Sequence, residues 1–249
     1  MIFRDRTEGG QLLATELEGF AFLKPIVLAL PRGGVPVAAE VAARLDAPLD
    51  VLLVRKIGAP SQPEFAIGAV AENSKPIVNR DVVAGLDITP ADLRGLVAKE
   101  LKEIQRQSKM FRDDRPMINV AGRVVILIDD GLATGATARA AIRSLKTRGA
   151  TEIILGVPVG AREAAIELRN EADQVFVLKE PPEFRAVGLW YHDFRAVTDQ
   201  EVKDLLEKNR QHHSAGAMRH ENVVIGEGKV KLIGDLTLPK QAKGLILFA

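Results

Sequence analysis

The sequence has no cysteine among its 249 residues, and only 4% of them are aromatic, with one tryptophan and one tyrosine. The absence of cysteine excludes a disulfide framework and is compatible with a reducing cytoplasm, which is the location we expect. No run of about 18 apolar residues occurs, and the start, MIFRDRTEGGQLLATEL, lacks the apolar segment of a secretion signal, so neither membrane spanning nor secretion is expected. A net charge of +1 argues against a strongly basic nucleic-acid-binding protein.

Several motifs of nucleotide and hydrolase chemistry are also missing. The segment from Gly131 to Gly135 contains no lysine and is one residue too short for a GxxxxGK[ST] loop, which argues against a nucleoside triphosphatase. No GxGxxG follows an early strand, which argues against a dinucleotide fold, and no GxSxG nucleophile elbow occurs. Three histidines, His212, His213 and His220, have no HExxH and no third ligand type beside them, so a solvated linker is favoured over a metal site.

The most informative segment present is VVILIDDGLATGATA, from Val124 to Ala138. Five consecutive aliphatic residues, 124–128, are typical of a strand covered on both faces of a parallel sheet. Asp129 and Asp130 follow at its carboxyl end, where parallel sheets bind ligands. Two adjacent carboxylates repel each other unless they meet a cation or hydroxyl donors, and a sugar diol with magnesium nearby would supply both.

A short loop rich in glycine and threonine follows the acidic pair and opens a helix predicted over 138–146. Free backbone N–H groups, the positive end of the helix dipole and two hydroxyls favour an anion, and the expected ligand is a ribose 5-phosphate group. The residues of this predicted phosphate loop are Gly131, Ala133, Thr134, Gly135, Ala136 and Thr137. Two other interpretations remain open at this point: an acidic pocket like that of response regulators, and two aspartates that merely cap a helix.

Two further segments place charge at predicted strand ends. A strand at 26–30 runs into Pro31-Arg32-Gly33-Gly34, where the glycines permit close approach of a ligand and Arg32 suits phosphate oxygens, although a glycine pair is also an ordinary turn. A strand at 49–54 ends in Arg55-Lys56, which suits an electrostatic clamp on a polyanion, although a solvated strand end is the alternative.

Together these segments resemble the type I phosphoribosyltransferases, which use phosphoribosyl pyrophosphate (PRPP). The resemblance implies an α/β fold with a three-layer parallel sheet and a small hood. It implies that Asp129 and Asp130 hold the ribose hydroxyls and Mg²⁺, that the phosphate loop holds the 5-phosphate, and that Arg32, Gly33 and Gly34 hold the pyrophosphate, with Arg55 and Lys56 as further catalytic residues. It also implies a loop within 58–73 that closes over the reaction centre, and transfer to a nitrogen acceptor, with a nucleobase as the expected class.

The segment PPEFRAVGLWYHDFRAV, 181–197, concentrates the few aromatic residues of the chain. In the family resemblance this region forms the hood over the acceptor. Trp190, Tyr191 and Phe194 could stack on a flat ring and Asp193 could bind its edge. Equally, these residues could anchor the hood in the core or form a contact in a homodimer, so the acceptor stays open.

We predict a phosphoribosyltransferase-like domain over residues 1–210, a linker over 211–221 and a β-rich tail over 222–249. Within the first domain, helices are expected over 35–45, 89–108, 163–170 and 198–209, and further strands over 153–159 and 175–178. The tail is expected to form two antiparallel strands and a third apolar one at 245–249. It resembles the opening strands of an α/β-hydrolase of the dienelactone-hydrolase kind, which suggests a fused hydrolase-like domain in a longer protein.

Two functions remain after these observations. The first is a magnesium-dependent phosphoribosyltransferase with PRPP and an unknown acceptor as its small-molecule substrates. The second is a regulatory module that binds PRPP or a nucleotide without transferring it, because binding and catalysis use the same contacts. Whether the hood admits an acceptor would separate the two.

Overall fold

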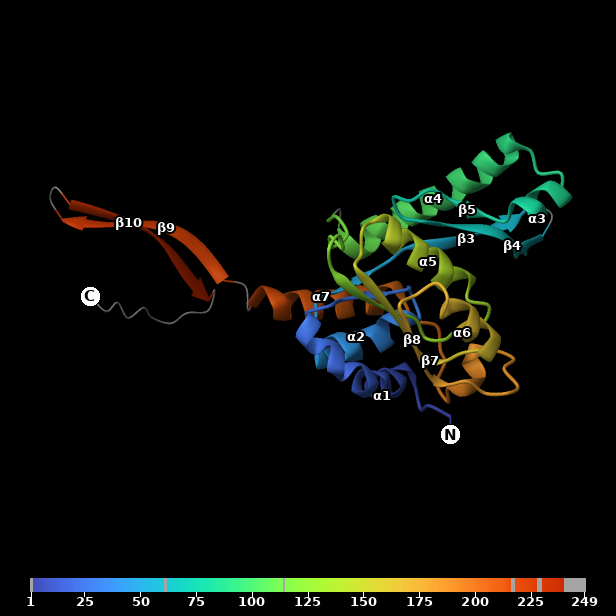
Figure 1. Ribbon diagram of the computed structural model, residues 1–249, viewed down its shortest axis with the longest axis horizontal. Helices are drawn as coiled ribbons and strands as arrows, with labels where there is room; N and C mark the ends of the chain where they lie inside the picture. Colours follow the sequence, from blue (N-terminus) through green and yellow to red (C-terminus); the bar gives the residue numbers. More distant parts are fainter. Residues whose placement is uncertain (1, 61, 114, 216–217, 228–229, 240–249) are drawn as a thin grey trace.

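A five-stranded parallel sheet forms the centre of the computed structural model, which describes residues 2–60, 62–113, 115–215, 218–227 and 230–239 (Figure 1). The strand order is β2-β1-β6-β7-β8. These strands are β1 Ile26–Ala29, β2 Leu49–Val51, β6 Val124–Ile128, β7 Glu152–Val159 and β8 Gln174–Lys179. Each neighbouring pair is parallel, and Ala29 lies opposite Ile128. The carboxyl ends of β1 and β6 therefore lie side by side.

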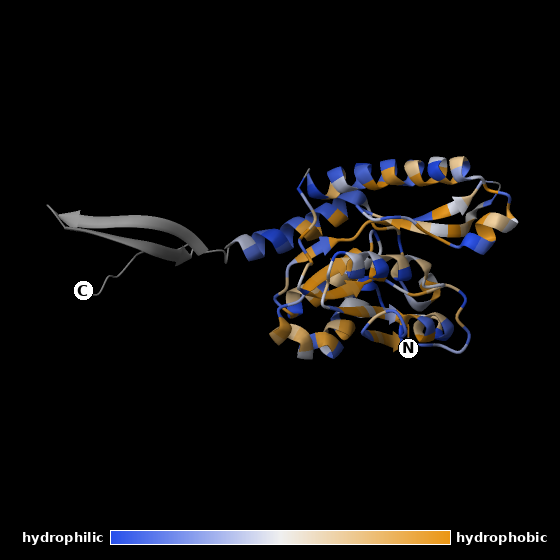
Figure 2. Ribbon diagram, turned by 45° about the horizontal axis from the view of Figure 1, so that its top comes forward, coloured by the Kyte–Doolittle hydropathy of each residue, from blue (hydrophilic) through white to orange (hydrophobic). Residues whose placement is uncertain are grey.

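Helices cover both faces of this sheet, which gives the three layers expected from the sequence. Alternate residues of the strands point to opposite faces: Val27 and Ile126 belong to one hydrophobic core, and Leu28 and Leu127 to the other. The first face packs against α1 Arg6–Leu17, α2 Gly34–Arg44 and α7 Asp199–Ala215, and the second against α5 Ala136–Thr147 and α6 Arg162–Leu168. Figure 2 shows the strands of the sheet as largely hydrophobic and the last turns of α7 as hydrophilic.

A second lobe is inserted between β2 and β6. It consists of an antiparallel sheet in the order β3-β4-β5 and two helices. Its elements are β3 Val54–Ala59, β4 Gln62–Ala71, β5 Ile77–Val78, α3 Arg80–Gly85 and α4 Pro90–Arg112. Helix α4 begins with a capping box, in which Thr89 and Asp92 exchange hydrogen bonds, and it runs four residues beyond the predicted end. Figure 1 shows the lobe as a separate layer beside the central sheet.

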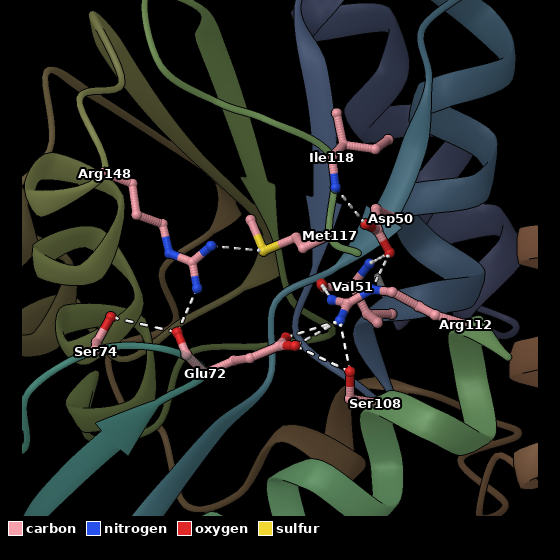
Figure 3. A network of polar contacts seen from close by, with 9 residues as sticks. All are labelled: Asp50, Val51, Glu72, Ser74, Ser108, Arg112, Met117, Ile118 and Arg148. Carbon is pink, nitrogen blue, oxygen red and sulfur yellow. Dashed lines mark hydrogen bonds and ion pairs between the residues drawn. The ribbon is translucent and has the colours of Figure 1, made fainter. Parts of the chain in front are cut away.

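One buried arginine joins the lobe to the core (Figure 3). Arg112, the last residue of α4, is 2% exposed and donates from Nε to Asp50 in β2 at 2.9 Å and from Nη1 to Glu72 after β4 at 2.8 Å. It also donates to the carbonyl of Val51. The second oxygen of Asp50 accepts the N–H of Ile118 at 3.0 Å. We call these five residues the waist, because their contacts join the lobe to the core.

Three details of the secondary structure differ from the expectations. The apolar run at 49–54 is not one strand, because β2 ends at Val51 and β3 begins at Val54 in the other sheet. The first half of the expected closing loop, 58–73, is largely strand, since β3 and β4 form an antiparallel pair that extends to Ala59 and Gln62. The expected linker, 211–221, is helical through Ala215 and forms a strand from Met218.

The two described strands of the tail pair as predicted. Strand β9 Met218–Glu227 is antiparallel to β10 Val230–Pro239. The third strand expected at 245–249 lies outside the described residues. Two short 3₁₀ helices of the described residues are η1 Glu18–Leu23 and η2 Val187–Trp190. Among the described residues, no helix combines the length and apolar character needed to cross a membrane.

Candidate functional site

The acidic pair lies where the sequence predicted, directly after β6. Asp129 accepts the backbone N–H of Asp130 at 2.8 Å through its Oδ1, and Asp130 accepts Nε of Arg6 at 2.8 Å through its Oδ2. Burial and the neighbouring Asp130 raise the pKa of Asp129 well above its usual range. Burial also raises the pKa of Asp130, although the Arg6 guanidinium acts in the opposite direction. Two partly desolvated carboxylates side by side would be stabilised by a cation or by hydroxyl donors.

The loop after β1 packs directly on the acidic pair. The N–H of Leu30 donates to the carbonyl of Ile128 at 2.8 Å, which joins the two loops at their base. A Cβ atom on Gly33 would lie 1.9 Å from Oδ2 of Asp130, and one on Gly34 would lie 2.8 Å from the Ile128 carbonyl oxygen. Both glycines are therefore required by close approach rather than by a turn alone. The peptide bond between Pro31 and Arg32 is cis, and the Arg32 guanidinium lies 3.5 Å from Asp199 at the start of α7.

The predicted phosphate loop joins β6 to α5 and presents an open helix start. Gly135 is the N-cap residue with φ of +73° and has no side chain to cap α5, while the hydroxyl of Thr134 accepts the N–H of Ala136 at 3.5 Å. Ala133, Thr134, Ala136 and Thr137 are exposed, whereas Gly135 is buried and Gly131 is partly buried. The N–H groups of this first turn and two exposed hydroxyls form the anion-binding arrangement typical of helix N-termini. This loop, the acidic pair and the Arg32–Gly34 loop share one edge of the sheet.

Arg55 and Lys56 do not lie at that edge as residues of a core strand. Both belong to β3 in the inserted lobe, and Arg55 forms an ion pair with Glu100 of α4 at 3.0 Å. The expectation that they end the second strand of the parallel sheet is wrong. The reason is that Leu52 and Leu53, which are fully buried, make the apolar run continuous although the chain changes sheets there. Their catalytic role stays a prediction.

The aromatic residues of the hood pack mainly on one another and on the N-terminal segment. Tyr191 is 5% exposed, its ring centroid lies 5.5 Å from that of Phe3, and it stacks on Phe194 with centroids 5.3 Å apart. Its hydroxyl donates to the carbonyl of Asp130 at 2.6 Å. Trp190 is partly buried in the same cluster, and Asp193 is exposed. Tyr191 thus anchors the hood on the acidic pair, and Phe194 packs on Tyr191.

A groove of about 370 Å³ lies beside the hood, and its wall includes hood residues. It is lined by Asp5, Arg6, Thr7, Pro36, Glu40, Asp193, Arg195, Val197, Glu201, Asp204 and Leu205. Arg195 on this wall pairs with Glu201 at 2.6 Å, and that contact together with hydrogen bonds from Thr198 lowers the pKa of Glu201 to about 2. Because Arg6 contacts both this groove and Asp130, the groove adjoins the acidic pair.

Sequence reasoning missed Arg6. A local signal existed, because Asp5 and Glu8 have the spacing of a helix start, and Asp5 does accept the N–H of Glu8 at 2.8 Å. That signal predicts a helix but not what its first residue contacts, since the partner Asp130 lies 124 residues away in the chain.

Among the described residues, no group of three or more histidine, cysteine, aspartate or glutamate side chains forms a metal site.

Comparisons with known proteins agree with this arrangement. Two curated proteins of Mycobacterium tuberculosis, from two strains of that organism, each named "putative phosphoribosyl transferase", are 41% identical to this chain over 257 residues. The alignment covers 100% of this chain but only 58% of theirs. A ribose-phosphate pyrophosphokinase of Methanosarcina acetivorans is 30% identical over 109 residues, covering 43% of this chain and 38% of its own length.

A solved structure and a family model extend the agreement. The crystal structure of a protein from Thermus thermophilus, TT1426, is 41% identical and superposes with a TM-score of 0.74, covering 84% of this chain and 99% of that one. The family model described as phosphoribosyl transferase domain matches residues 8–188, which include the acidic pair, both loops and the inserted lobe. The chain therefore belongs to the phosphoribosyl transferase domain family.

Proposed function

We propose that this chain binds PRPP with Mg²⁺ and transfers its ribose 5-phosphate group to a nitrogen acceptor with release of pyrophosphate. The observation that carries the proposal is the contact between Gly33 and the carboxylate of Asp130, which brings the loop for the leaving group onto the residues for the ribose. A nucleophile held beside both could attack C1 of the ribose. Because this chain spans 58% of the length of the curated relatives, the activity of the whole protein is part of the proposal.

Different segments of the site would bind different parts of PRPP. The 5-phosphate would lie on the first turn of α5 with Thr134 and Thr137, and the ribose hydroxyls would donate to the acidic pair. The pyrophosphate would lie on the backbone of the Arg32–Gly34 loop, with the Arg32 guanidinium turning from Asp199 toward it. This arrangement would hold C1 in place, so that catalysis is mainly positioning and neutralisation of charge on the leaving group.

The residues fit a magnesium ion. Mg²⁺ commonly binds through one or two carboxylates, several waters and the phosphates of the substrate, and Asp129 and Asp130 offer two adjacent carboxylates directly after β6. When bound, the ion would neutralise charge on the pyrophosphate. As the bond from C1 to the pyrophosphate oxygen breaks, the oxygen keeps the electron pair; the acceptor nitrogen forms the new bond to C1 and releases its proton to solvent or a base.

The hood gives reason to keep a second function. Tyr191 and Phe194 are covered by each other and by Phe3 and Arg6, so these rings are not free platforms for a base. An acceptor would instead enter the groove lined by Asp193 and Arg195. A module that binds PRPP without transferring it would need no such entry, and it is our second candidate.

Calorimetric titration of PRPP with Mg²⁺ tests both functions. The wild type is expected to bind, the double variant Asp129→Asn/Asp130→Asn is expected to lose binding while it stays folded, and Asp113→Asn, at an exposed helix end, is the matched control. Binding followed by pyrophosphate release with one member of a panel of nucleobases and amines supports the transferase. Binding without release supports the regulatory module. Absence of binding by the wild type, or full binding by the double variant, overturns the PRPP site.

A further inference from the structure

The Arg6 side chain connects the acidic pair to the hood. Its Nε donates to Oδ2 of Asp130 at 2.8 Å, its Nη1 donates to the carbonyl of Arg195 at 2.9 Å, and its guanidinium carbon lies 3.9 Å from the centre of the Phe194 ring. The side chain is 10% exposed and that of Asp130 is 15% exposed. All these contacts come from one planar guanidinium, whose separate N–H groups point in fixed directions.

The sequence of α1 allows this guanidinium to reach the site. Asp5 caps the helix, so that Arg6 is its first residue. Two glycines one turn later let the helix approach closely: a Cβ on Gly9 would lie 3.1 Å from Cγ of Pro158, and one on Gly10 would lie 2.7 Å from the carbonyl oxygen of Val37. Larger residues there would push α1 away from β7 and α2, and would withdraw Arg6 from Asp130.

The hood touches the acidic pair in two ways. Tyr191 donates its hydroxyl to the carbonyl of Asp130, so it fixes the main chain of that residue. Arg6 fixes the carboxylate of Asp130 and at the same time holds the hood backbone at Arg195. Displacement of the hood at Arg195 would therefore be transmitted through Arg6 to the carboxylate.

The position of that carboxylate is sensitive to small shifts. Its Oδ2 already lies against the backbone of Gly33, in the space that a Cβ would occupy. The hydrogen bond from Arg6 therefore decides how this oxygen sits between the pyrophosphate loop and the ribose. The guanidinium also offsets the repulsion between two adjacent carboxylates.

We propose that Arg6 is a positioning residue that couples the PRPP site to the acceptor side of the protein, by holding the Asp130 carboxylate and the hood backbone with one guanidinium. This inference rests on the proposed function. It implies that binding at the PRPP site and the arrangement of the hood change together when Arg6 is altered.

The test uses three substitutions and two readouts. Arg6→Met removes the charge and the donors, Arg6→Lys keeps the charge but loses the planar fork, and Arg6→Ala opens space for added guanidinium. PRPP binding with Mg²⁺ is measured by calorimetry. The fluorescence of Trp190, the only tryptophan of the chain, reports on the hood without any ligand. Arg44→Met is the matched control, because Arg44 forms an exposed ion pair with Glu18 at the far end of α2 from the ligand loops.

We expect Arg6→Met to weaken PRPP binding about tenfold to hundredfold, the range for loss of a charge-assisted hydrogen bond, and to shift Trp190 emission in the free protein. Arg6→Lys should retain part of the PRPP binding but keep the shifted emission, because one ammonium does not reach both partners in the same geometry. Guanidinium should restore both readouts in Arg6→Ala. Arg44→Met should leave both unchanged.

Three results would overturn the inference. They are wild-type PRPP binding by both Arg6→Met and Arg6→Lys, unchanged Trp190 emission in both, and failure of guanidinium to restore either readout in Arg6→Ala. If Arg6→Met does not fold, Arg6→Lys decides the question alone. Failure of the proposed function looks different, because the wild type itself would then not bind PRPP while the fluorescence comparison would still test the link between Arg6 and the hood.

Discussion

Replacing Gly33 by alanine should weaken PRPP binding much more than it destabilises the fold. The added Cβ would lie 1.9 Å from Oδ2 and 2.6 Å from Cγ of Asp130, so the loop and the carboxylate must separate by about 1 Å to reach the 3.0 Å that real Cβ atoms keep. A shift of that size lengthens the 2.8 Å contact between Arg6 and Asp130 or displaces the Arg32–Gly34 loop. Misplacement by about 1 Å commonly costs on the order of a hundredfold in function.

The cost in stability should be much smaller. Overpacking of this kind destabilises by about 1–3 kcal/mol, which corresponds to a fall in Tm of about 2–12 °C for a chain of this size. Gly95→Ala is the matched control: Gly95 lies inside α4 with no atom within 4 Å of an added Cβ, and alanine there should raise the stability by about 1 kcal/mol.

Calorimetry with PRPP and thermal denaturation of both variants check this reasoning. We expect Gly33→Ala to bind PRPP at least tenfold more weakly and Gly95→Ala to bind as the wild type does. If Gly33→Ala kept both the wild-type affinity and the wild-type Tm, the close approach of the two loops would be refuted.

Two further perturbations test the waist and the hood. Arg112→Met should lower the free energy of unfolding by about 3–5 kcal/mol, because it leaves two buried carboxylates without their cation. Urea denaturation would measure this loss. A loss below about 1 kcal/mol would contradict the description of the waist. Gly131→Ala should shift Trp190 emission, since the new Cβ would lie 2.4 Å from Val187 of the hood. Adding Val187→Ala should reverse that shift. Unchanged emission in the single variant, or a shift that persists in the double variant, would contradict this packing.

Much of the fold could be predicted because parallel strands covered on both faces are written as short continuous aliphatic runs. The runs at 26–30, 124–128, 153–159 and 175–178 all became core strands within a residue or two of the expected bounds. The acidic pair and both loops could be placed for a related reason, since each follows directly after one of these runs. Adjacent parallel strands bring such loops to one edge.

Aliphatic runs failed to mark a strand boundary where the sequence stays apolar although the chain passes from one sheet to another. Leu52 and Leu53 are buried between two sheets, so the run at 49–54 gave no sign that the chain leaves the core and takes Arg55 with it. For Tyr191, composition could not distinguish a stacking platform from an anchor, because both require an aromatic ring. Only the three-dimensional position beside Phe3 shows that it is an anchor.

Charged residues that act in the interior were the hardest to foresee. Arg112 lies at the end of an amphipathic helix whose other arginines and lysines are largely solvated, and nothing in its sequence neighbours marks it as buried. Arg6 lies on a helix with two glycines and a weak apolar stripe, and its partners are 124 and 189 residues away. Long-range ion pairs of this kind leave no periodic pattern in a single sequence.

The polar contacts of the waist hold the two ends of the inserted lobe together. The chain leaves the core after Val51 and returns after Arg112, and one guanidinium contacts residues at the start of the excursion and Glu72 in its middle. Lengthening the outer part of the lobe, or substituting residues in α3 and on the exposed face of α4, would therefore leave the parallel sheet and the loops after β1 and β6 in place. The lobe could in this sense be altered without rebuilding the edge of the sheet that carries Asp129 and Asp130.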